Sequence, residues 1–172
     1  MKTEITTSTQ TSNGLSKLTI SNPEQAILGS GLRTVEDVLK IKGLPSIAKM
    51  ALTSNDMKLV ILKWLIHANK FMNLKRQMTE AQSVLAAITI LEDYSYLNTA
   101  DLALFFKNLI NGKYGNFYES FNNQKLCDAL DLYVESRFET AKNRSEANHN
   151  RFSSGDIQST FLEDKKREKK KR

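Results

Sequence analysis

Few side chains in this sequence have a type and spacing that could do chemistry. The single thiol, Cys127, has no histidine and acid placed beside it by sequence to activate it as a nucleophile, so we interpret it as a small core or flank residue. His67 lies near Lys63 and Lys70, and no acidic or sulfur ligand is close to it in the sequence. We interpret His67 as a partly exposed filler, because two histidines cannot make the usual His-rich metal site.

Sequence signatures of the common catalytic and nucleotide-binding sites are missing. The chain contains no P-loop, no GxGxxG, no CxxC, no HExxH and no GxSxG elbow. Its carboxylates fall mainly on polar helix faces, where paired-acid catalysis has no visible support. We therefore expect a protein that is not an enzyme and that has no catalytic residues, no metal and no cofactor.

The side chains best suited to binding a partner lie in an aromatic stretch from Tyr94 to Phe121. Eight of the fourteen aromatic residues of the chain fall there. Most of these rings should build the core, because aromatic residues at helical spacing are usually buried. A loop around two glycines presents Lys113, Tyr114 and Tyr118, and loops on rigid scaffolds often carry function. We expect these three residues to form a surface for a protein partner.

The strongest charge feature is the C-terminal end of the chain. Residues 163–172 hold seven basic and three acidic residues, a net +4, so the rest of the chain contributes only +2 of the total +6. The folded body is therefore a weak candidate for a DNA-binding surface. A phosphate-binding use of Lys70, Lys75 and Arg76 stays open. We expect nucleic-acid contacts from the basic residues of the end itself: Lys165, Lys166, Arg167, Lys169, Lys170, Lys171 and Arg172.

Two further patterns in the sequence bear on DNA binding. Residues 42–48 are similar to a helix-hairpin-helix turn, but Pro45 stands where a second glycine would offer its backbone N–H. We interpret this segment as an interhelical turn in which Pro45 opens a short helix to Leu52. A sequence-specific repressor would need a polar recognition helix, and the candidate helices are mostly apolar.

Composition indicates an all-α protein. Two prolines and seven glycines in 172 residues, with many Leu, Ala, Lys and Glu, favour one compact bundle of about five to seven helices. We expect a disordered N-terminal tail over residues 1–20, a helical domain over 21–142 and a polar, basic, flexible tail over 143–172. One cysteine excludes an intrachain disulfide and fits a reducing cytoplasm. The longest apolar run, residues 59–66, is too short to span a membrane.

Capping signatures predict where the helices begin. The predicted starts are at Pro23, with a short helix to Leu28, at Thr34, at residues 53–56, at residues 79–82, at Asn98 with Asp101, and at Asn122 or Asn123. Gly112 should end the helix that begins at Asn98. The apolar pattern of the last helix ends about Ala141, residues 143–152 could continue it as a frayed helix, and residues 153–155 should break it.

One predicted helix, over residues 57–72, is the most apolar in the chain. Its first stripe runs through Met57, Val60, Ile61, Trp64, Leu65, Ala68, Phe71 and Met72. A second stripe is formed by Leu59, Leu62 and Ile66. Apolar surface on two sides predicts a central helix that several neighbours cover.

Three segments carry a resemblance, at residues 71–82 (FMNLKRQMTEAQ), 94–107 (YSYLNTADLALFFK) and 112–121 (GKYGNFYESF). They resemble a family of small uncharacterised helical proteins from phages and mobile elements of Bacteroides-type bacteria, over about Gly43 to Ala141. Asn122 and Asn123 depart from it, where an Asp-Gly-like turn is expected. The resemblance implies an accessory genetic element and a cytoplasmic setting, with no catalytic residues. The helical body with a charged end is also similar in architecture to phage helicase loaders.

Two classes of function follow from these features. The first is a non-enzymatic adaptor in DNA replication or mobilisation, which holds a protein such as a replicative helicase while the basic tail adds contact with nucleic acid. The second is a protein-only regulator or inhibitor of a host protein, in which the tail serves solubility or acidic partners. A sequence-specific repressor is the weaker third option. No membrane contact is expected, and the sequence leaves the oligomeric state open.

Overall fold

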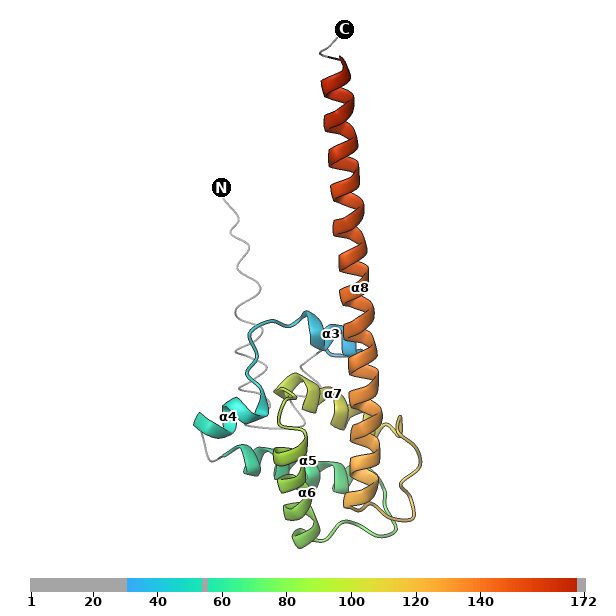
Figure 1. Cartoon of the computed structure of the whole chain (residues 1–172). Helices are drawn as coiled ribbons and strands as arrows, with labels where there is room; N and C mark the ends of the chain where they lie inside the picture. Colours follow the sequence, from blue (N-terminus) through green and yellow to red (C-terminus); the bar gives the residue numbers. More distant parts are fainter. Residues whose placement is uncertain (1–30, 54–55, 170–172) are drawn as a thin grey trace, which may run out of the picture. The chain divides into compact units, whose positions relative to one another are not determined.

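The computed structural model describes residues 31–53 and 56–169, with side chains described up to residue 150. The chain divides into two units between Glu135 and Ser136. The helices are α3 (Val35–Lys40), α4 (Ile47–Thr53), α5 (Met57–Phe71), α6 (Glu80–Asp93), α7 (Thr99–Ile110) and α8 (Asn123–Lys169), as labelled in Figure 1. The expected tail over residues 1–20 and the expected helix from Pro23 lie outside the described residues.

The all-α prediction is confirmed for the part of the chain that the structure describes. It holds six helices and no named strand, and only an isolated antiparallel bridge joins Ser46 to Asn98. α5 packs against α4, α6 and α7, and α3 packs against α7. This bundle positions the loops that connect α5 to α6 and α7 to α8.

Three predicted helix starts are confirmed by complete capping boxes. In each box the N-cap side chain accepts a backbone N–H three residues later, and the side chain at that later position accepts the N-cap N–H. The pairs are Thr34 with Asp37, Thr79 with Gln82 and Asn98 with Asp101. The predicted cap of the last helix is also present, since Asn122 Oδ1 accepts the backbone N–H of Lys125 at 3.0 Å.

Two helix starts differ from the prediction. α4 begins at Ile47 rather than at Pro45, and Ser46 Oγ accepts the backbone N–H of Lys49 at 3.3 Å. At the start of α5, Asp56 makes no side-chain capping hydrogen bond. A capping residue has an extended backbone, whereas Asp56 already has helical angles, φ −82° and ψ −9°.

The central helix is α7. The helix predicted over residues 57–72 does pack against several neighbours, but the prediction that both of its apolar stripes are covered was wrong. Every residue of α7 from Thr99 to Phe106 is buried. Ala100 and Ala103 are small enough for neighbouring elements to approach closely on their side of α7. α5 buries one face only, and in its second apolar stripe Leu59 and Ile66 lie exposed while Leu62 is half-buried.

Aromatic rings join the helices in the core, as the aromatic stretch predicted. Trp64 of α5 stacks on Phe106 of α7, with ring centroids 5.3 Å apart. Phe105 meets Phe106 edge-on at 5.1 Å and Tyr133 of α8 at 5.9 Å. All four rings are at most 1% exposed. Trp64 is therefore a core residue, as expected.

The second unit is described as the continuation of α8, which runs on to Lys169 without interruption (Figure 1). The helix does continue over residues 143–152, as the sequence allowed, but the predicted break at residues 153–155 was wrong for the backbone. A single glycine costs a helix only about 1 kcal/mol relative to alanine and does not by itself end it. Phe138, predicted on the apolar face, is 71% exposed. Among the described residues, no helix has the length and apolar character to cross a bilayer.

Candidate partner-binding pocket

An open pocket of about 680 Å³ lies in the first unit, where the ends of α5 and α7 meet the loop that follows α7. This loop, residues 112–118, is called the glycine loop below. The pocket is lined by Met72, Asn73, Leu109, Ile110, Gly112, Gly115, Asn116, Phe117 and Tyr118. The lining combines apolar side chains with two side-chain amides, one phenol and the main chain of two glycines.

The glycine loop begins with a Schellman turn at the end of α7. The backbone N–H of Lys113 donates to the carbonyl of Asn108 at 2.9 Å, and that of Gly112 donates to Leu109 at 3.0 Å. Gly112 has φ 72° and Gly115 has φ 116°, conformations that other residues adopt at a cost. The two glycines therefore fold the loop back over the end of α7, as their positions in the sequence indicated.

The opposite wall is the connection between α5 and α6, and a buried amide holds it in place. Asn69 of α5 donates from Nδ2 to the carbonyl of Met78 at 2.7 Å, and its Oδ1 accepts the backbone N–H of Met78 at 3.0 Å. One side chain thus closes a loop of eight residues, because both its donor and its acceptor bind the same residue. Sequence reasoning missed Asn69.

The two walls are joined by backbone hydrogen bonds. The N–H of Lys75 donates to the carbonyl of Tyr118 at 2.7 Å, and that of Phe121 donates to the carbonyl of Arg76 at 3.3 Å. Lys75 Nζ also lies 3.4 Å from Glu119 Oε2, in an exposed ion pair that adds little to stability. The pocket therefore has walls fixed by the main chain.

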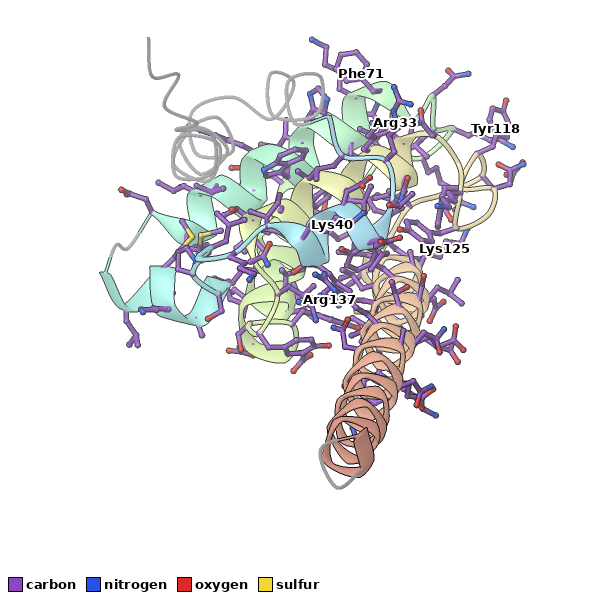
Figure 2. The ribbon with its side chains drawn as sticks, turned by 90° about the horizontal axis from the view of Figure 1, so that it is seen from above. Arg33, Lys40, Phe71, Tyr118, Lys125 and Arg137 are labelled. Atoms are coloured by element: carbon purple, nitrogen blue, oxygen red, sulfur yellow. The ribbon has the colours of Figure 1, made fainter. Side chains whose placement is uncertain are left out.

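The structure places the three predicted partner residues differently. Lys113 is exposed, and Tyr118 is 51% exposed on the pocket wall and points away from the helices (Figure 2). Tyr114 does not lie at the tip of the loop: its ring stacks on Phe105, with centroids 5.4 Å apart, and its hydroxyl accepts a hydrogen bond from Asn108 at 3.3 Å. Burial raises the pKa of Tyr114 above its ordinary value. Tyr114 therefore supports the loop from inside.

The predicted nucleic-acid residues fall partly within α8. Lys165, Lys166, Arg167 and Lys169 belong to this helix, while Lys170, Lys171 and Arg172 lie outside the described residues. Their role in binding nucleic acid stays a prediction. Of the alternative phosphate ligands, Lys70 and Arg76 are exposed, and Lys70 Nζ lies 5.7 Å from the ring centroid of Phe71.

Nothing in the described part of the chain groups three or more His, Cys, Asp or Glu residues as a metal site would. Cys127 is half-buried on α8, and burial, together with the charge of Asp131, raises the pKa of its thiol. Tyr94 donates a hydrogen bond of 2.7 Å to Asp131 Oδ1, and burial followed by this bond raises the pKa of its phenol. A raised thiol pKa disfavours the thiolate that a nucleophile needs.

No protein-family model, no curated protein and no solved structure matches this chain. What the protein binds is therefore inferred from the chemistry of its own surfaces.

Proposed function

We propose that this chain is a non-enzymatic adaptor that holds a protein partner at the pocket between α5, α7 and the glycine loop. The observation that supports this proposal is an open pocket, lined by both apolar and polar groups, with a half-exposed tyrosine on its wall. Tyrosine is enriched at protein interfaces, because its ring contributes apolar contact while its hydroxyl stays hydrated. Fixed walls reduce the ordering that binding would otherwise require.

The pocket suits an apolar side chain presented by a peptide segment. Leu109, Ile110 and Phe117 contribute an aliphatic and aromatic floor for it. The amides of Asn73 and Asn116 offer polar contacts at the wall, and the Asn116 side chain is oriented by the 2.8 Å hydrogen bond that it accepts from the Tyr118 N–H. Apolar lining residues combined with oriented polar groups are typical of binding pockets.

The proposal also includes a setting and a second contact. The resemblance implies an accessory protein of a phage or mobile element, and a replicative helicase or another replication protein is the partner that we propose to test first. The basic residues from Lys165 to Arg172 would add salt-dependent contact with nucleic acid. A protein-only regulator of a host protein is the second candidate, and it differs in needing no nucleic acid.

Capture of partners from the native host tests the pocket. The tagged chain, Tyr118→Ala and Tyr96→Ala are compared at low and high salt after nuclease treatment, with retained proteins identified by mass. Tyr96 is the matched control, because it is 52% exposed and Tyr118 is 51% exposed. A replication protein that stays bound to the Tyr96 variant and is lost from the Tyr118 variant supports the proposal. Equal retention by both variants contradicts it.

Removal of the basic end separates the two candidate functions. A chain that ends at Leu162 should bind DNA with a flatter salt dependence, because each phosphate contact contributes about 0.7–0.9 to the slope of log K against log salt. An unchanged slope shows that these residues do not contact nucleic acid. The protein-only regulator is favoured if the shortened chain keeps its affinity for the partner and the full chain does not bind DNA.

A further inference from the structure

The outward face of α5 carries a second apolar surface. Leu59, Leu62 and Ile66 follow one another at three- and four-residue steps, so they lie on one side of the helix. Leu59 and Ile66 are each 55% exposed, and Leu62 between them is half-buried. These three residues are called the α5 stripe below. None of them lines the pocket.

Lysines flank the α5 stripe on both sides. Lys63 and Lys70 each follow a stripe residue by four positions, and Lys58 precedes Leu62 by four, so each is a neighbour of the stripe on the helix surface. All three lysines are exposed. α5 itself contains no aspartate and no glutamate, and the nearest acidic residue along the chain is Asp56, its N-cap, so the charges on the helix beside the stripe are positive.

We infer that the α5 stripe is a docking surface for an amphipathic α-helix of a partner protein, whose aliphatic ridge is flanked by Asp or Glu. Aliphatic side chains at helical steps form a ridge that packs into the groove of a second helix. An acidic flank on that helix would meet the lysines and give the encounter its orientation. This surface goes beyond the pocket proposed above and does not depend on it.

The charge of α5 argues against two other occupants. A second copy of this chain docked through the same face would bring two sets of three lysines together, and like charges brought together at an interface cost several kcal/mol. A nucleic acid would find its phosphates facing Leu59 and Ile66, which offer no hydrogen-bond donor. An acidic helix satisfies both the apolar centre and the basic rim.

A membrane surface fits less well. Interfacial helices insert an apolar face rich in Trp, Phe and Leu about 5–10 Å into the lipid. The stripe contains no aromatic residue, and the other side of α5 is held in the protein core by Ile61, Leu65 and Ala68. A packed partner helix needs only side-chain contact and no insertion.

The test uses the full chain and two labelled synthetic helical peptides. Both peptides have a leucine ridge, and the ridge is flanked by glutamate in one and by lysine in the other. Fluorescence anisotropy compares the wild type with Leu59→Glu, Ile66→Glu and Leu85→Glu. Leu85, on α6, is the matched control because it is also 55% exposed.

We expect the wild type and the Leu85 variant to bind the Glu-flanked peptide alike. The Leu59 and Ile66 variants should each bind it about tenfold more weakly or worse. Lys63→Glu combined with Lys70→Glu should turn the preference toward the Lys-flanked peptide. The proposal is overturned if the wild type binds the two peptides with equal affinity. It is also overturned if Leu85→Glu weakens binding of the Glu-flanked peptide as much as Leu59→Glu and Ile66→Glu do.

Two further experiments test for other occupants of the α5 stripe. One places a photo-crosslinking residue at position 66 of the free full chain, and the other measures binding to vesicles. A crosslink to residues 1–30 of the same molecule shows that the chain covers its own stripe, and a crosslinked dimer shows that a second copy does. Binding to phosphatidylserine vesicles that Ile66→Glu abolishes, with no binding of the Glu-flanked peptide, shows a membrane site. Each of these outcomes overturns the proposal while leaving the pocket unaffected.

Discussion

The hydroxyl of Tyr133 donates a hydrogen bond of 2.7 Å to Oδ1 of Asp101, and both residues are at most 1% exposed. The other carboxylate oxygen, Oδ2, accepts the backbone N–H of Asn98 at 3.0 Å. Asp101 lies in the first turn of α7, where the helix dipole favours negative charge. The carboxylate joins the start of the central helix to the first turns of α8.

Tyr133→Phe should destabilise the fold by about 1–3 kcal/mol, because it removes the hydroxyl and leaves a buried carboxylate oxygen with one donor fewer. Urea unfolding measures the change. Tyr118→Phe is the control: Tyr118 is 51% exposed, so loss of its hydroxyl should leave the midpoint nearly unchanged. Equal midpoints for the Tyr133 variant and the wild type would show that the hydrogen bond contributes nothing.

Trp64→Ala should cost on the order of 3–5 kcal/mol, because it opens a cavity against Phe106 in the core. Thermal unfolding followed by circular dichroism gives the change in melting temperature. Leu59→Ala, on the same helix but 55% exposed, should have a much smaller effect. A melting temperature that is the same for the Trp64 variant and the wild type contradicts the burial of this side chain.

Helix starts could be predicted because their signals are local. Thr34, Thr79 and Asn98 each form their capping box with a residue three positions away, so the sequence contains the whole interaction. Gly112 was predictable for the same reason, since a left-handed residue at a helix end favours glycine. The interior of the bundle was harder to predict, because burial depends on which neighbours cover a face.

The choice of central helix shows this difficulty. The helix at 57–71 has two apolar stripes, yet Leu59 and Ile66 lie exposed while α7 is buried on every side. Ala100 and Ala103 are part of the reason, because both are buried and their small side chains leave room for neighbouring elements to pack close to α7. Alanine is only weakly apolar, so these two residues contribute little to the hydrophobic pattern from which burial is predicted.

Part of the candidate pocket followed from the sequence and part did not. Two glycines among aromatic residues indicated an ordered loop, and Tyr118 lies on the pocket wall. The inward turn of Tyr114 was not predictable, since it depends on stacking against Phe105. Asn69 was missed because its partner, Met78, lies nine positions away and no motif links the two.

Asn69→Ala should loosen the connection between α5 and α6, since it removes both hydrogen bonds to Met78 and leaves that buried main chain without them. We expect a loss of about 1–3 kcal/mol in stability. Hydrogen exchange at the Met78 amide should become faster. Asn111→Ala, at an exposed position, is the control. Unchanged exchange at Met78 would show that other contacts hold the loop.

The start of α3 should loosen on acidification. Asp37 accepts the backbone N–H groups of Arg33 at 3.1 Å and Thr34 at 2.9 Å, and these bonds, that of Arg33 first, lower the pKa of its carboxyl. Because the folded pKa is the lower one, the stabilisation is present above the unfolded value of about 4 and is lost as pH falls through the folded value. Amide exchange at Thr34 measured from pH 6 down to pH 2 should therefore accelerate, beyond its intrinsic pH dependence, only in the acidic part of the range. Asp37→Asn, which has no carboxyl to titrate, should lack this step, and a step of equal size in that variant would assign the change to another group.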